Sequence, residues 1–129
     1  MSGAPAREAA RARAVELEQA CDFAGAARAA LEANDAAMAA RMAVLAKRDD
    51  LFDECERALI EGADGVAACK RVASDLLARG FGNHAGRMFS LAGDAASAGE
   101  AFARGGDAAR AAMELERAGR PADGAKALE

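Results

Sequence analysis

His84 is the only histidine of the 129-residue chain, and it is the first residue to consider for proton transfer or metal binding. Either chemistry needs partner side chains, and no HExxH or CxxC motif surrounds this residue. His84 follows Asn83 at the expected start of a helix, where a partly exposed polar residue is ordinary. We therefore expect no catalytic residue and no metal site. A small enzyme or regulator with a site near His84 is kept as an alternative.

The segment Gly80–Ala85 fits the letters GxGxxA, which in dinucleotide-binding proteins form the turn between a strand and a helix. Here residues 73–79 have a helical pattern, and no strand follows the segment. Glycines that end one helix and begin the next explain the same letters. We therefore expect no cofactor.

The three cysteines, Cys21, Cys55 and Cys69, form no CxxC pair. An odd number of cysteines argues against a disulfide framework and is typical of a reducing cytoplasm, where we expect the protein. Cys55 and Cys69 fall at small or apolar positions inside expected helices, as core residues do. Cys21 lies at a helix junction with no histidine nearby to activate its thiol.

Charged residues provide the candidates for binding. Asp49, Asp50, Asp53 and Glu54 form an acidic cluster at the expected start of a helix. Acids at this place complement the helix dipole and form a solvated face, but the cluster could also bind a basic partner. Arginines recur in the C-terminal part of the chain at positions outside the expected core. The candidate partner-binding residues are Asp49, Asp50, Asp53, Glu54, Arg104, Arg110 and Arg117.

Charge and hydropathy exclude several kinds of partner. The formal net charge is −4, which disfavours nucleic acid because binding its backbone needs a basic face. The apolar runs are much shorter than the roughly 20 residues of a membrane-spanning helix, and the N-terminus lacks the apolar segment of a secretory signal. The excess of alanine and arginine is typical of a GC-rich bacterial genome.

The composition predicts an all-α fold. Alanine accounts for 40 of the 129 residues, and four valines, one isoleucine and no threonine leave five β-branched residues. Strands favour β-branched and aromatic side chains, so these residues are too few to furnish a sheet.

A tandem repeat of 13 residues runs through the C-terminal part of the chain. Its blocks begin at Gly80, Gly93, Gly106 and Gly119. Each block holds a pair of small residues followed by one large apolar residue, at Phe89, Phe102, Leu115 and Leu128. Glycine before aspartate, as in Gly93–Asp94, predicts a left-handed residue ending one helix and an N-cap opening the next. Helices this short are marginal alone in water, so each must pack on the next.

The N-terminal half is expected to be helical but less regular. We predict disorder over residues 1–6 and a single repeat domain over 7–129, with an irregular half over 7–64. Helices are expected over 7–20 and 22–33, then from Asn34, and again from Asp50 as N-cap. After a turn at 62–65, a helix over 66–79 is expected to bury Val66, Cys69, Val72, Ala73, Leu76 and Leu77.

The spacing of Ala85, Phe89 and Ala92 resembles the second helix of a tetratricopeptide (TPR) repeat, and the next two blocks match it in part. Helical-hairpin arrays of vesicle-coat and intraflagellar-transport subunits are equally similar. The 34-residue TPR period is absent. The resemblance implies a right-handed α-solenoid of about nine short antiparallel helices, and it transfers no ligand-binding residue.

Such an array implies a non-enzymatic adaptor or scaffold that binds a partner protein or peptide on a helical-repeat surface. The alternative is a structural segment that stacks end to end. It is suggested by the last block, which ends without the strongly polar capping helix that solenoids need. Self-association would then use the C-terminal end.

Overall fold

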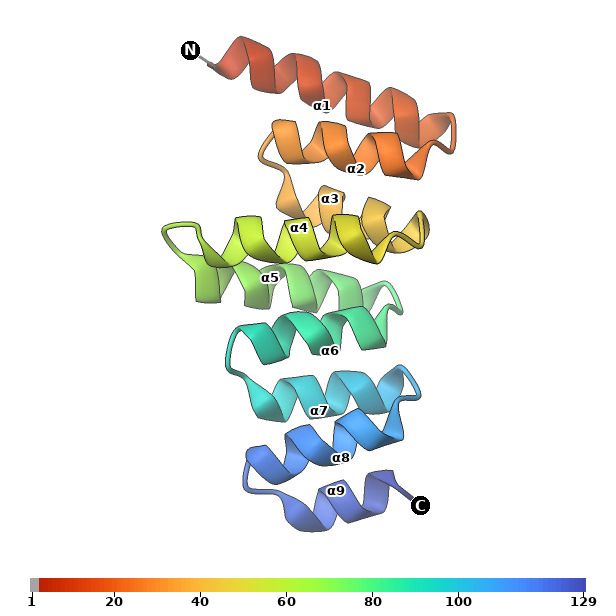
Figure 1. Cartoon of the computed structure of the whole chain (residues 1–129), viewed down its shortest axis with the longest axis vertical. Helices are drawn as coiled ribbons and strands as arrows, with labels where there is room; N and C mark the ends of the chain where they lie inside the picture. Colours follow the sequence, from red (N-terminus) through yellow and green to blue (C-terminus); the bar gives the residue numbers. More distant parts are fainter. Residues whose placement is uncertain (1–2) are drawn as a thin grey trace. The chain divides into compact units, whose positions relative to one another are not determined.

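The structure, a computed structural model, describes residues 3–129, and these form nine helices and no strand. This confirms the all-α prediction (Figure 1). The described chain contains no helix that is long and apolar enough to cross a membrane. The chain divides into two compact units, Met1–Ala58 and Leu59–Glu129, close to the turn expected at residues 62–65.

The first unit contains α1 (Ala4–Gln19), α2 (Phe23–Glu32), α3 (Ala36–Leu45) and most of α4 (Asp49–Ile60). Helix α1 packs on α2, and α2 on α3. The core is mostly alanine, with large buried residues at Met38, Met42, Leu51 and Phe52.

Helix α1 begins earlier than the sequence suggested. It starts at Ala4, with Pro5 in its first turn, so it includes residues 4–6 of the segment for which disorder was predicted. Proline favours the first turn of a helix because its fixed φ is already helical and its missing N–H would have no partner there. Residues 1 and 2 lie outside the described part of the chain.

The turns of the first unit have the same 13-residue spacing as the glycine blocks. Cys21, Asn34 and Lys47 each follow a helix and have positive φ angles of 60°, 58° and 56°. Asp22 follows Cys21, and Asp35 follows Asn34. Each aspartate accepts a hydrogen bond from the backbone N–H three residues later, at 3.0 Å for Asp22 and 3.1 Å for Asp35. The half expected to be irregular is therefore regular in its turns, although no glycine marks them.

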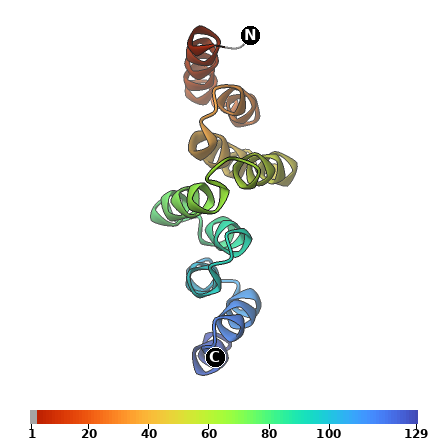
Figure 2. The same cartoon turned by 90° about the vertical axis from the view of Figure 1, so that its left-hand side faces the viewer.

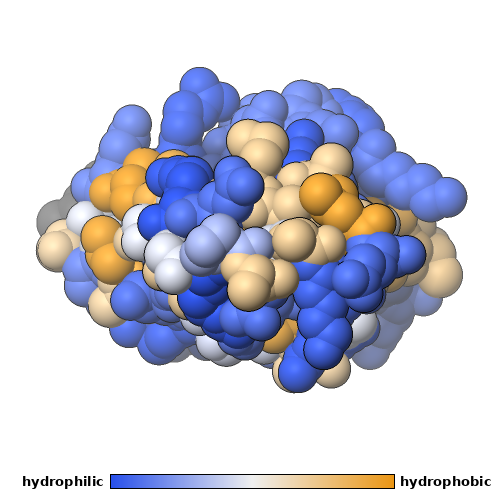
Figure 3. Space-filling model, turned by 90° about the horizontal axis from the view of Figure 1, so that it is seen from below, coloured by the Kyte–Doolittle hydropathy of each residue, from blue (hydrophilic) through white to orange (hydrophobic). Residues whose placement is uncertain are grey.

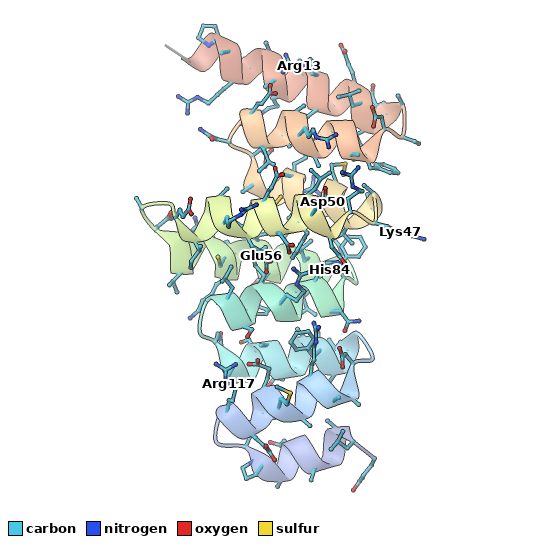
Figure 4. All side chains as sticks on the ribbon, in the orientation of Figure 1. Arg13, Lys47, Asp50, Glu56, His84 and Arg117 are labelled. Carbon is cyan, nitrogen blue, oxygen red and sulfur yellow. The ribbon has the colours of Figure 1, made fainter. Side chains whose placement is uncertain are left out.

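Replacing Lys47 with glycine is expected to stabilise the protein by about 0.5–1 kcal/mol, because only glycine adopts a left-handed conformation without steric cost. The Lys47 side chain projects away from the helices (Figure 4), so its loss removes little packing. Urea unfolding measures the change. The control is Ala46→Gly, where φ is −74° and glycine should destabilise. Equal shifts in the two variants would argue against a strained Lys47.

The second unit contains five helices, each packed on the next in the chain. They are α5 (Gly65–Ala78), α6 (Gly82–Leu91), α7 (Ala95–Arg104), α8 (Ala108–Arg117) and α9 (Pro121–Ala127). Within this unit α5 and α7 lie on one side, and α6 and α8 on the other (Figure 2).

Large residues of the second unit cover glycines on the preceding helix. A Cβ atom added to Gly86 would lie 2.8 Å from three ring atoms of Phe102, so the ring rests directly on the α6 backbone. A Cβ on Gly99 would lie 2.7 Å from Cγ of Leu115. Phe89, Phe102 and Leu115 are buried, which confirms the packing role predicted for them.

Gly82 and Gly105 bring the backbones of α6 and α7 into direct contact. A Cβ on Gly82 would lie 2.6 Å from the Gly105 nitrogen and 2.7 Å from the Ala101 carbonyl oxygen. Gly80, with φ of +90°, lies in the turn between α5 and α6. The glycines of the GxGxxA segment thus serve a helix–helix turn and a close backbone contact.

Val66, which was predicted to be buried, is exposed, and so is Leu128 of the last block. Val66 is 51% exposed because α5, with 14 residues, is one turn longer than the 10-residue α6 on which it packs. Leu128 is 61% exposed because α9 has only seven residues and ends before it. Leu77 is half-buried.

The predicted aspartate N-caps are confirmed at α7 and α8. Asp94 accepts a hydrogen bond from the Ser97 N–H at 3.1 Å, and Asp107 from the Arg110 N–H at 3.1 Å. Partial burial alone would raise the pKa of Asp94, but the hydrogen bonds from Ser97 and the nearby Lys70 ammonium lower it below its ordinary value. The folded protein therefore favours the charged form of this carboxylate.

The pKa of Asp94 is lower in the folded than in the unfolded protein. The ionised carboxylate therefore contributes its full stability above the unfolded pKa of about 3.9, and this contribution is lost as the pH falls through the folded pKa. Asp94→Asn keeps an acceptor for the N-cap but cannot titrate. Thermal melts between about pH 6 and about pH 2.5 should therefore show a smaller fall in Tm for this variant than for the wild type. Equal falls would contradict the assignment.

Candidate functional site

The acidic candidates lie at the beginning of α4, in the first unit. Helix α4 begins at Asp49, so Asp50 is inside the helix and the prediction that it is the N-cap is wrong. Arg48 precedes the helix and donates two hydrogen bonds to Asp50, at 2.9 and 2.7 Å. These bonds lower the pKa of Asp50 to about 2. Asp53 and Glu54 are exposed, and Asp50 is labelled in Figure 4.

The three candidate arginines lie in the second unit. Arg104 is exposed at the C-terminal end of α7. Arg110 lies in the first turn of α8, and its guanidinium carbon lies 5.6 Å from the centre of the Phe102 ring. Arg117, at the other end of α8 (Figure 4), donates a hydrogen bond of 2.9 Å to Oε1 of Glu114. The arginines and the acidic cluster thus belong to different units.

The remaining candidates for chemistry are His84 and the cysteines. His84 is half-buried in the first turn of α6. Cys55 and Cys69 are buried, as expected for core residues, and burial raises the pKa of Cys55 to about 12, so its thiol is protonated. Cys21 is exposed. Within residues 3–129, no three or more His, Cys, Asp or Glu side chains group as a metal ion would require.

Helix α8 departs from the repeat at one pair of residues. When the blocks are aligned on their left-handed turns, Arg41–Met42 of α3 and Arg87–Met88 of α6 occupy the same two positions, and both methionines are fully buried. In α8 these positions hold Met113 and Glu114, so the order of charged and apolar residues is reversed. Met113 is 61% exposed, whereas Glu114 is 6% exposed.

Glu114 is only half satisfied in its buried position. Its Oε1 accepts hydrogen bonds from the Ser90 hydroxyl at 3.0 Å and from Arg117 at 2.9 Å. Its Oε2 is buried without a hydrogen-bond partner among residues 3–129. A buried acceptor left unpaired costs about 1–3 kcal/mol, and more when it is charged. The repeat therefore loses stability at α8, where methionine or alanine would fill the position.

An exposed apolar residue adjoins each partner of the Ser90–Glu114 hydrogen bond in the sequence. Leu91 follows Ser90 on α6 and is 39% exposed, and Met113 precedes Glu114 on α8. The hydrogen bond between Ser90 and Glu114 links the two helices that lie on the same side of the unit (Figure 2). We define the α6–α8 surface as Ser90, Leu91, Met113, Glu114 and Arg117.

Only Arg117 of this surface was among the residues selected from the sequence. The glycines, small pairs and large apolar residues define the 13-residue block without the positions of Met113 and Glu114. A full alignment of the 13-residue blocks, including those at Cys21 and Asn34, would have revealed the reversal.

Replacing Glu114 with methionine is expected to raise the free energy of unfolding by about 1–2 kcal/mol, because it removes a half-satisfied buried charge and restores the residue found in α3 and α6. Urea unfolding measures the change. The control is Glu114→Gln, which keeps the shape and the polar contacts and should change stability less. A methionine variant less stable than the wild type would show that the carboxylate stabilises α8.

Comparison of this chain with protein-family models, curated proteins and solved structures found no match.

Proposed function

We propose that the protein is a non-enzymatic, right-handed α-solenoid of the TPR-like kind that binds another protein or a peptide, as an adaptor or scaffold in the cytoplasm. Support comes from left-handed turn residues at 13-residue spacing, at positions 21, 34 and 47 and again at 80, 93, 106 and 119. It comes also from the packing of α1 on α2, of α2 on α3, and of each helix from α5 to α8 on the next. Stacked helical repeats present continuous side-chain surfaces, and such surfaces are used for binding.

The observation that carries this proposal is the reversal of Met113 and Glu114 in α8. In a helix with only a packing role, the Arg–Met order of α3 and α6 would bury the methionine and leave the charged side chain partly exposed. The reversed order instead exposes an apolar side chain and buries a charged one, and both changes cost stability. A loss of stability at one surface is common where function requires it. We therefore assign binding to the α6–α8 surface.

Site-specific photo-crosslinking tests the assignment. A photoreactive phenylalanine analogue placed at Leu91 keeps an apolar side chain in the surface, while the same analogue at Val66 of α5 is the control at another exposed apolar position. In source cells, the Leu91 position is expected to give a specific protein adduct that the Val66 position does not. Absence of an adduct, or identical adducts at both positions, would contradict binding at the α6–α8 surface.

End-to-end stacking is the second candidate function. It is favoured by Leu128, which is 61% exposed although its counterparts Phe89, Phe102 and Leu115 are buried. Seen from below, apolar residues lie in separate places among hydrophilic ones (Figure 3). Light scattering over a range of concentrations tests this candidate. Stacking predicts a mass that increases with concentration and a smaller increase for Leu128→Glu, whereas a monomer at every concentration would exclude it.

A further inference from the structure

We propose that Glu114 is a latch between α6 and α8. Turned inward, as in this structure, it ties the two helices together, and turned outward into water it releases them. The latch sets the spacing of the helices that form the α6–α8 surface, so its use in binding rests on the proposed function. Three features of the second unit support it: a hydrogen bond that skips one helix, the incomplete pairing of Glu114, and the direct packing of consecutive helices.

The hydrogen bond between Ser90 and Glu114 joins two helices that are not consecutive. Helices α6 and α8 both pack on α7, and the Ser90 hydroxyl donates to Oε1 of Glu114 at 3.0 Å across that helix. Both residues depart from α3, which has Val44 and Met42 at the same positions relative to its left-handed turn. Two polar exceptions that meet from different helices indicate a specific link rather than the packing common to the repeat.

The inward and outward positions of Glu114 are close in free energy. Inward, Oε1 accepts hydrogen bonds from Ser90 and Arg117, while Oε2 is buried without a partner among residues 3–129. Outward, the bond to Ser90 is lost, but water can bind both oxygens, and the exposed Arg117 on the same helix can remain paired. A buried unpaired oxygen offsets much of what the inward hydrogen bonds contribute, so the carboxylate can leave at little net cost.

Release of the latch leaves the contacts between consecutive helices in place. The Phe102 ring of α7 lies on Gly86 of α6, and Leu115 of α8 lies on Gly99 of α7. These contacts are apolar and do not involve Glu114, so they hold α6 and α8 to α7 in either position of the carboxylate. Opening therefore changes the separation of α6 and α8 more than it changes their packing on α7.

Distances between pairs of spin labels, measured by electron paramagnetic resonance on the whole protein without a partner, test the latch. The α6–α8 pair has labels at Leu91 and Glu116, which are exposed near the C-terminal ends of the two helices. The control pair, Ala78 and Arg104, occupies exposed positions at the corresponding ends of α5 and α7. The labels are attached to unnatural keto amino acids, because the exposed Cys21 would react with a thiol reagent.

Ser90→Ala removes the bond between the helices. In this variant the α6–α8 pair is expected to shift to a longer mean distance with a distribution about twofold broader, while the control pair stays as in the wild type. Glu114→Gln should keep the wild-type distances, because its amide oxygen can accept the same two hydrogen bonds. An unchanged α6–α8 distance in Ser90→Ala, or an equal change in both pairs, would overturn the latch.

Failure of the latch and failure of the proposed function are distinguishable. The distances are measured without a partner, so unchanged distances would remove the latch and leave binding at the α6–α8 surface untouched. Conversely, absence of a crosslinked adduct at Leu91 would contradict that binding and leave the latch in place. Circular dichroism of each variant establishes that a changed distance does not come from unfolding.

Discussion

Replacing Phe102 with alanine is expected to lower the free energy of unfolding by about 3–5 kcal/mol, a large part of the stability of a small domain. The ring is buried, lies on the bare backbone at Gly86 and is covered by Arg110. Its removal leaves a cavity beside a residue that has no side chain to fill it. Thermal and urea unfolding, followed by circular dichroism at helical wavelengths, measures the loss.

Leu128→Ala is the matched control, because Leu128 holds the same position in the last block but is exposed. Its effect should stay within about 0.5 kcal/mol. Similar effects in the two variants would contradict the packing of Phe102 on Gly86. A chain without cooperative unfolding in either variant would contradict the folded repeat itself.

Gly82→Ala is expected to cost about 3 kcal/mol or more, at the upper end of the range for overpacking. The added methyl group would meet the Gly105 nitrogen and the Ala101 carbonyl oxygen, and backbone atoms cannot rotate away as a side chain can. Helices α6 and α7 would have to separate at this end. Urea unfolding of the purified variant measures the cost.

Gly93→Ala is the control for glycine itself. It has a positive φ of 81°, but no atom within 4 Å would meet its new methyl group. It should therefore cost only the strain of a left-handed alanine, about 1–2 kcal/mol. If Gly82→Ala cost no more than this control, the backbone contact between α6 and α7 would not be what requires glycine.

The helices of the second unit could be predicted because glycine and aspartate mark their turns. Gly93 and Gly106 are left-handed, and the aspartates after them cap the next helices, as expected. In the first unit the same turns occur at Cys21, Asn34 and Lys47. A positive φ is sterically unfavourable for cysteine or lysine, and packing must offset this cost. Neither residue type indicates a turn in the sequence.

The candidate site could be predicted only in part. Arg117 was selected because it lies outside the core, but Glu114 was not, since an isolated glutamate in an amphipathic helix is usually exposed. Its burial follows from the close approach of α6 and α8 around Ser90, which depends on the packing of α7. The exposure of Val66 could not be predicted from the sequence either, because it depends on the different lengths of α5 and α6.

Under the proposed function, α8 gives up stability in order to bind a partner. Exchanging Met113 and Glu114 for the order found in α3 and α6, as M113R/E114M, removes the exposed methionine and the buried charge together. The decisive measurement is the Kd of this variant for the protein crosslinked at Leu91, made alongside its Tm. We predict a higher Tm and a Kd increased at least about tenfold. A higher Tm with an unchanged Kd would contradict the claim.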